Sequence, residues 1–175
     1  MCTVTYLPLR NEGFVLTSNR DESPMRITFH PEKYLENDIE LIYPKDELAE
    51  GTWIGCSDKK RLVCLLNGGF EKHQRNVYYK MSRGVVVKNI LSVKNPIEYI
   101  DEFDFINIEP FTIVLVEWRT SLNLYELIWD GKVKHLKKLT QKPRIWSSSM
   151  LYDPKMKSDR QDWFNDWLAI NPDFT

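Results

Sequence analysis

The sequence is poor in cysteine and contains no long hydrophobic run. Its three cysteines are an odd number and show no CxxC spacing, which argues against both a disulfide framework and a structural zinc site. The longest apolar stretches, such as residues 112–116, are far too short to span a bilayer, and no basic region followed by an apolar run opens the chain. We therefore expect a soluble protein without a transmembrane segment, located in the reducing cytoplasm.

An excess of charge of either sign is also lacking. The 24 Lys and Arg residues are balanced by 25 Asp and Glu residues, so no overall positive field attracts nucleic acid, and no nucleic-acid partner is expected. Repeats, low-complexity tracts and Gly/Ser linkers are absent from the sequence as well. Its 42% hydrophobic and 13% aromatic content is enough for a sizeable core, and we predict one domain over residues 1–175.

The three histidines form no metal-ligand pattern. His30, His73 and His135 lack the mutual spacing of metal ligands, no HExxH motif occurs, and no serine or cysteine lies in a GxSxG elbow. We therefore predict no metal site and no Ser-His-Asp triad. His73 lies in the basic, polar stretch 72–75 and is a candidate for substrate binding, with an ordinary surface histidine as the alternative.

A hairpin is predicted at the start of the chain. Two short β-prone runs, residues 2–7 and 14–18, are separated by a polar, turn-prone segment. If the hairpin is centred near residue 10 or 11, Cys2 lies opposite Asn19 or Arg20. A slip of one residue would turn every side chain to the other face.

The remaining pattern predicts packed sheets with helices on the outside. Helix starts are marked by Asn95 and Asp153, each a capping residue followed by proline, and residues 82–93 form a third candidate helix. An aromatic stripe at helical spacing follows Asp153. Trp129 to Lys132 is typical of a tight hairpin turn. Further strands are predicted at residues 39–43, 52–56, 61–66, 111–117, 122–129 and 132–136.

Cys2 is the leading candidate for a nucleophile. Removal of Met1 would leave a thiol and a free α-amine on the same residue. An ordinary thiol has a pKa of about 8.5 and an α-amine one of about 7.7 to 8.0, so the amine can accept the thiol proton near neutral pH. The alternative is an ordinary small buried cysteine.

Residues 19–22 place an amide, a guanidinium and two carboxylates after the second predicted strand. Arg20 next to a cysteine would favour the thiolate, and Asp21 could accept a hydrogen bond from an N-terminal ammonium. Asn19 and Glu22 are candidates for substrate binding. The alternative is a solvated polar turn.

Two glycine-containing segments complete the candidate site. Asn67 and Gly68 end an apolar strand, where backbone N–H groups can approach a ligand and build an oxyanion site. Trp53 lies in the glycine-bounded segment 51–55 and is a candidate for substrate contact. A plain turn and a plain core strand are the respective alternatives.

Taken in order, several segments resemble the NRDE family, also called the Transport and Golgi organisation protein 2 family. The likeness begins with residues 1–6, 17–24, 51–55 and 65–68, which match in order and spacing. Any one of these motifs is weak, but the ordered set is specific and covers nearly the whole chain. Later blocks that fit the family are residues 82–84, 146–149, 151–152 and 160–164.

The family in turn resembles the N-terminal nucleophile (Ntn) hydrolases that expose an N-terminal cysteine, such as penicillin V acylase and bile-salt hydrolases. This likeness implies an α+β fold, an αββα sandwich of two mainly antiparallel sheets, here expected to lack terminal elements. It implies Cys2 as the nucleophile, Arg20 and Asp21 as site residues and Asn67 as an oxyanion donor. Residues 147–149 are similar to a serine pair of those enzymes but are not followed by their arginine.

Two functions follow from this resemblance. The first is a cysteine-dependent amidohydrolase that acts on a small amide or acyl substrate and needs no cofactor. The second is a non-catalytic carrier or chaperone for haem, acyl-CoA or another amphipathic metabolite, since NRDE members have been linked to haem trafficking and to lipid or acyl-CoA handling. Fold alone does not decide between them.

Overall fold

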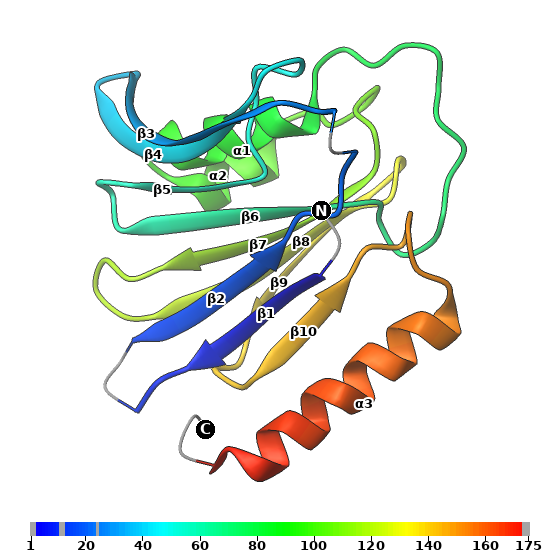
Figure 1. Ribbon diagram of the computed structural model, residues 1–175. Coiled ribbons are helices and arrows are strands. Elements are labelled where there is room, and N and C mark those ends of the chain that lie inside the picture. Colours follow the sequence, from blue (N-terminus) through cyan, green and yellow to red (C-terminus); the bar gives the residue numbers. More distant parts are fainter. Residues whose placement is uncertain (1–2, 11–12, 24, 173–175) are drawn as a thin grey trace.

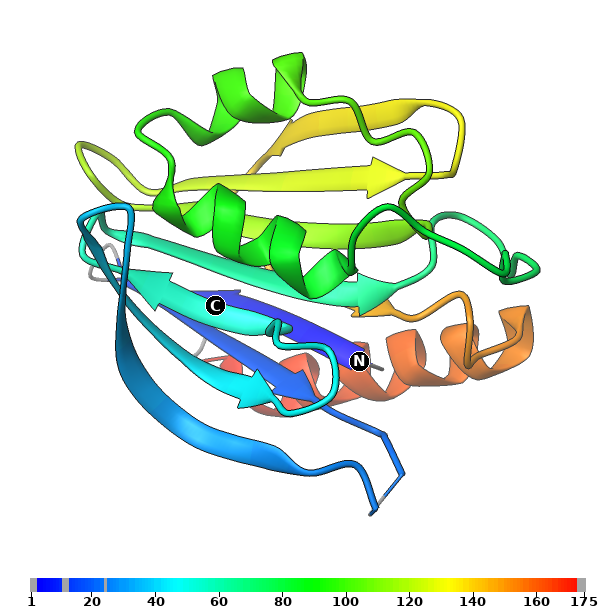
Figure 2. The same ribbon diagram turned by 90° about the horizontal axis from the view of Figure 1, so that it is seen from above.

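The computed structural model describes residues 3–10, 13–23 and 25–172. Two antiparallel sheets pack face to face, with α1 and α2 outside the larger sheet and α3 outside the smaller one (Figures 1 and 2). The smaller sheet has the order β10-β1-β2 and the larger one the order β3-β4-β5-β6-β7-β8-β9. The strands are β1 (Thr3–Pro8), β2 (Phe14–Asn19), β3 (Thr28–Glu36), β4 (Ile39–Asp46), β5 (Ile54–Ser57), β6 (Arg61–Asn67), β7 (Phe111–Glu117), β8 (Asn123–Trp129), β9 (Lys134–Leu139) and β10 (Arg144–Ser147).

In the part of the chain that the structure describes, three helices cover the sheets. Two lie over the larger sheet, α1 (Arg83–Ser92) and α2 (Pro96–Glu102), and α3 (Pro154–Ile170) lies over the smaller one (Figure 2). The predicted caps are confirmed: the Asn95 side chain accepts a hydrogen bond from the Ile97 N–H, and Asp153 accepts one from the Met156 N–H. No helix in residues 3–10, 13–23 and 25–172 is both long and apolar enough to cross a membrane.

Strand β7 shows how the two cores are divided. Residues 111–116 are all buried, because the strand lies inside the larger sheet with a layer on each face. Its side chains alternate, so Phe111, Ile113 and Leu115 join the core under the helices, while Val114 and Val116 join the core between the sheets. This continuous apolar run is typical of a strand that is covered on both sides.

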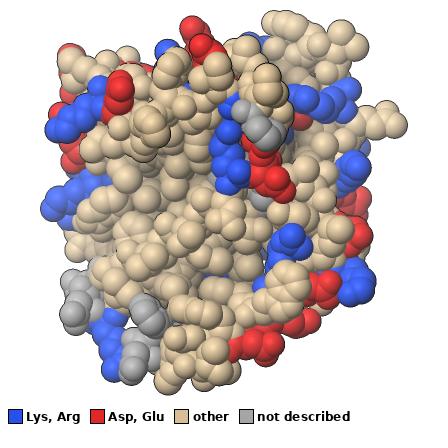
Figure 3. Space-filling view, in the orientation of Figure 1, with Lys and Arg blue, Asp and Glu red and all other residues tan. Residues whose placement is uncertain are grey.

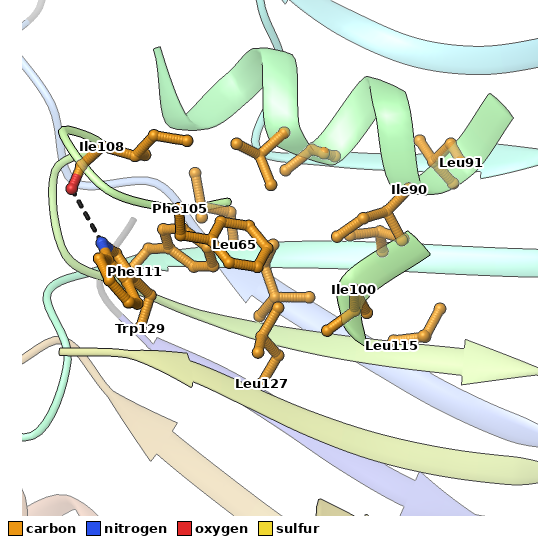
Figure 4. Close-up of a cluster of buried hydrophobic side chains, with 14 of the residues drawn as sticks. Leu65, Ile90, Leu91, Ile100, Phe105, Ile108, Phe111, Leu115, Leu127 and Trp129 are labelled. Carbon is orange, nitrogen blue, oxygen red and sulfur yellow. Dashed lines mark hydrogen bonds between the residues drawn. The ribbon is translucent and has the colours of Figure 1, made fainter. Parts of the chain in front are cut away.

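The helix-side core is rich in aromatic rings (Figure 4). Phe105 packs against Phe111 with ring centroids 5.5 Å apart, and against Trp129 at 5.9 Å. The Trp129 indole N–H donates to the Ile108 carbonyl oxygen at 2.9 Å, so its polar end is satisfied although the ring is buried. The core between the sheets is formed by the β1 residues Val4 and Tyr6 packed against β6 and β7.

The predicted two-sheet architecture with outer helices is confirmed, but two strands were not expected. Strand β3 contains Pro31 and many charged residues, and it pairs with β4 through an irregular register between Phe29 and Glu32. Proline is tolerated there because β3 is an edge strand with a bulge. Strand β10 pairs with β1, far away in the sequence.

The predicted aromatic stripe on the last helix is only partly covered. Phe164 is buried against the smaller sheet, whereas Trp163 and Trp167 are 64% and 38% exposed. Arg160 instead lies over the Tyr152 ring, 3.6 Å from its centroid. Helical spacing therefore identified α3 correctly, but did not predict how much of its apolar side the fold covers.

Candidate active site

The predicted first hairpin is confirmed by the pairing of β1 with β2. Thr3 lies opposite Asn19, and the antiparallel register continues without a break to the pair of Pro8 and Phe14. Cys2 itself lies outside the described residues, so its predicted position opposite Asn19 or Arg20 stays a prediction. The hairpin nevertheless places the beginning of β1 next to the end of β2, where the polar segment 19–22 starts.

A cavity of about 470 Å³ lies where several strand ends and loops meet. Its wall is formed by segments around Arg20, Asp46, Asn67, Tyr79 and Glu109, which are far apart in the sequence. Acidic and basic side chains are interspersed on the molecular face shown in Figure 3, in line with the nearly neutral net charge. Four arginines line the cavity: Arg20, Arg26, Arg75 and Arg83.

One group of charges in the wall is organised by Asp46, a carboxylate that is almost entirely buried. Arg20 Nη2 lies 2.9 Å and Arg26 Nε lies 2.7 Å from Asp46 Oδ2. Burial by itself raises the pKa of Asp46, but the Ala49 N–H and the two guanidinium groups outweigh it, and the pKa lies below its usual value. Arg20 also stacks over the Trp53 ring at 4.5 Å, so its guanidinium is held from two sides.

A second group of charges is organised by Glu109, which is also buried. Arg83 Nη2 lies 3.2 Å from Glu109 Oε2, and Arg75 Nε lies 3.1 Å from Oε1. Burial lowers the pKa of the Arg83 guanidinium, and the neighbouring Glu109 opposes this effect. His73 Nε2 lies 3.5 Å from Glu109 Oε1, so the predicted substrate-binding histidine contacts a wall residue without lining the cavity itself.

The end of β6 brings Asn67 into the wall and gives Gly68 a structural role. The Gly68 N–H donates to the Pro110 carbonyl oxygen at 3.0 Å and is therefore already engaged. Gly68 has a φ of +90°, and a Cβ atom there would lie 2.2 Å from Ser149 Oγ, so only glycine fits. Ser148 Oγ donates to the Asn67 carbonyl oxygen at 2.7 Å, which ties the serine segment to the cavity wall.

The structure gathers some of the predicted site residues and separates others. Four of them line the cavity: Arg20, Glu22, Trp53 and Asn67. The others lie outside its wall: Asn19 pairs within the hairpin, Asp21 is exposed, Gly68 packs against Ser149, and His73 contacts Glu109. Five charged wall residues were not among the predicted site residues: Arg26, Asp46, Arg75, Arg83 and Glu109.

The other two cysteines are poorly suited to nucleophilic chemistry. Burial raises the pKa of Cys64 to about 12, and its Sγ donates a hydrogen bond to Ser18 Oγ at 3.4 Å. Burial also raises the pKa of the Cys56 thiol. Both thiols are therefore protonated at neutral pH, whereas the reactive form of a cysteine is the thiolate. Within the described residues, no group of three or more His, Cys, Asp or Glu side chains is placed to hold a metal ion.

Comparison with known families decides the relationship of the chain. Residues 1–171 match the family described as Transport and Golgi organisation 2. The chain belongs to this family. No curated protein matches the sequence significantly.

Solved structures with a similar fold include Ntn hydrolases. An N-acylethanolamine-hydrolyzing acid amidase ortholog from Caenorhabditis elegans is 14% identical with a TM-score of 0.61, over 90% of this chain and 74% of that one. Two variants of conjugated bile acid hydrolase from Clostridium perfringens are each 12% identical with a TM-score of 0.57. The matches cover 92% and 93% of this chain but only 57% of the hydrolase. They establish an Ntn-hydrolase-like fold.

Proposed function

We propose that this family member is an N-terminal-cysteine amidohydrolase that cleaves a small amide or acyl substrate. The observation that carries the proposal is the pairing of Thr3 with Asn19. Thr3 follows Cys2 in the sequence, and its partner Asn19 precedes Arg20, which lines the 470 Å³ cavity together with Asn67. A nucleophile at the N-terminus would thus meet a charged cavity of sufficient size for a small ligand.

In this proposal, the Cys2 thiol gives its proton to its own α-amine, and the sulfur attacks the amide carbonyl carbon. The amide nitrogen receives the proton and leaves as an amine, which produces a thioester on Cys2. Water then attacks the thioester, releases the carboxylic acid and restores the thiol. No cofactor is required for any of these steps.

Neighbouring side chains orient the base and stabilise the negative charge that develops during the reaction. Asp21 orients the α-amine, the Asn67 amide donates to the oxyanion, and Arg20 stabilises negative charge. The contacts of Arg20 with Asp46 and Trp53 support this role, because a guanidinium held from two sides is already oriented before the substrate binds. Cys56 and Cys64 are protonated and offer no competing thiolate.

The proposal predicts that the active protein begins at Cys2 with a free amine. Intact mass of protein from its native host should show complete loss of Met1. A chain carrying one extra glycine before Cys2 keeps the thiol but turns the Cys2 amine into an amide. We expect its turnover to fall about a hundredfold or more, because the general base is lost.

The matched control is the same chain after proteolytic removal of the added glycine, which should recover full activity. Retention of Met1 in all active protein, or equal turnover with and without the extra glycine, would contradict the Ntn mechanism. Binding of haem or acyl-CoA without turnover of any amide in a broad screen would favour the carrier function instead.

A further inference from the structure

Around Asp46, the positive charges of the cavity wall are balanced by carboxylates. Arg20 and Arg26 meet the buried Asp46 carboxylate, and Arg26 Nη1 also lies 3.2 Å from Glu22 Oε2. Two guanidinium groups thus face two carboxylates. The formal charges of this part of the wall therefore sum to zero.

The wall around Glu109 is not balanced in the same way. Arg75 and Arg83 both contact this single carboxylate, at 3.1 Å and 3.2 Å respectively, so one positive charge remains in excess. His73 adds no negative charge there. The excess lies within the cavity lining, because all three charged residues belong to the wall.

Contacts within the described part of the chain leave several N–H donors of the two guanidinium groups available. Each arginine has five N–H donors. Arg75 contacts Glu109 through Nε and Nη2, and Arg83 uses Nη2 for Glu109 and Nη1 for the Pro110 carbonyl oxygen. These contacts engage fewer than half of the donors of the pair. An oxyanion can accept several of the remaining N–H groups at once.

The N-terminus of α1 increases the positive electrostatic potential around Arg83. Arg83 is the first residue of α1, and the first turn of that helix contains no acidic residue. A positive side chain at a helix N-terminus is electrostatically unfavourable, and Glu109, the carboxylate that contacts Arg83, is shared with Arg75. The close approach of Gly51 and Gly84, where a Cβ on either would be 3.0 Å or less from the other segment, fixes the helix start against the cavity wall.

We infer that Arg75 and Arg83 form a subsite for an oxyanion group of the ligand, a carboxylate or a phosphate, and that Glu109 positions both guanidinium groups. The inference deepens the proposed function by assigning its substrate to the anionic amphipathic compounds. Apolar wall residues, among them Val77 and Met81, accommodate the uncharged part of such a ligand.

The test is a binding experiment that does not require turnover. Calorimetric titration of the Cys2→Ala protein compares three probes with the same eight-carbon chain: N-octanoylglycine, octyl phosphate and the uncharged N-octanoylglycinamide. We expect at least one anionic probe to bind about fivefold to tenfold more tightly than the neutral probe, as for partly screened charged hydrogen bonds. The preferred anion identifies the ligand class.

Arg75 is the residue to change, because its side chain is 72% exposed and its replacement should leave the fold intact, whereas the Arg83 side chain is only 13% exposed. Arg75→Gln should remove most of the preference for the anion, and Arg75→Lys should keep part of it, since lysine retains the charge but not the planar fork. Lys72→Gln is the matched control, because it removes one exposed charge from the same loop without altering the cavity wall.

Equal affinity for all three probes, or equal losses in the Arg75→Gln and Lys72→Gln proteins, would overturn the subsite. Failure of the hydrolase proposal gives a different result: the anion preference and its dependence on Arg75 persist, but the wild-type protein cleaves no amide.

Discussion

Amide turnover is expected to fall by about a thousandfold or more when Cys2 is replaced by alanine, because no nucleophile remains to form the thioester. Substrate binding should largely persist, since Arg20, Trp53 and Asn67 of the cavity wall are unchanged. The measurement is single-turnover kinetics on processed protein, with binding followed separately. Thermal unfolding should show similar stability, because the substitution removes only one sulfur atom.

Cys56→Ala provides the matched control for this experiment. It removes a thiol by the same substitution from β5, and Cys56 does not line the cavity. Its turnover should remain close to that of the wild type. Undiminished amide cleavage by the Cys2→Ala protein would exclude Cys2 as the nucleophile.

The second large effect is a loss of stability that we expect when Arg61 is replaced by methionine. The Arg61 side chain is completely buried, with Nε 3.0 Å from Glu117 Oε1 and Nη1 2.6 Å from the Ile90 carbonyl oxygen and 2.9 Å from that of Val93. It thus pairs a carboxylate and satisfies carbonyl groups at the end of α1. Methionine leaves these acceptors unpaired, and the free energy of unfolding should fall by about 3–5 kcal/mol. Denaturant titration measures the loss.

Two further variants separate the causes of that loss. Arg119→Met removes a nearby exposed arginine and should change the free energy of unfolding by less than about 0.5 kcal/mol. Adding Glu117→Gln to Arg61→Met should recover part of the stability, since the unpaired carboxylate is then neutral. A loss in Arg61→Met no larger than that in Arg119→Met would contradict the structural role of Arg61.

Features that depend on neighbouring residues were predictable from the sequence. The β1–β2 hairpin follows from two β-prone runs joined by a short polar segment, and the helix starts follow from Asn95 and Asp153 directly before prolines. The turn between β8 and β9 is similarly local: Asp130 accepts hydrogen bonds from the Lys132 and Val133 N–H groups, and Gly131 has a positive φ.

Features that depend on distant contacts were not predictable in this way. Pairing of β1 with β10 joins the two ends of the chain, and β3 resembles a polar loop because Pro31 occupies an irregular edge position. From the sequence, Arg61 is predicted only as the first residue of a strand. Its burial becomes evident only when the end of α1 packs above it.

The candidate site also contains residues that local patterns predict and residues that only distant contacts bring together. Arg20, Glu22, Trp53 and Asn67 were found because they lie in segments that resemble the family. The Glu109 group was missed, since its partners Arg75 and Arg83 are 34 and 26 positions away and no local pattern connects them. The sequence signals for this group were the basic stretch 72–75, which was singled out for His73, and the family-like block of residues 82–84.

The central claim is that Cys2 carries the acyl group during turnover, and intact-mass measurement tests it most directly. Protein quenched during reaction with a cleaved amide should gain the mass of the acyl group, and peptide mapping should place it on Cys2. The added mass should disappear when the substrate is exhausted. Hydrolysis without an acylated intermediate under these conditions, or with the acyl group on Cys56 or Cys64, would contradict the account.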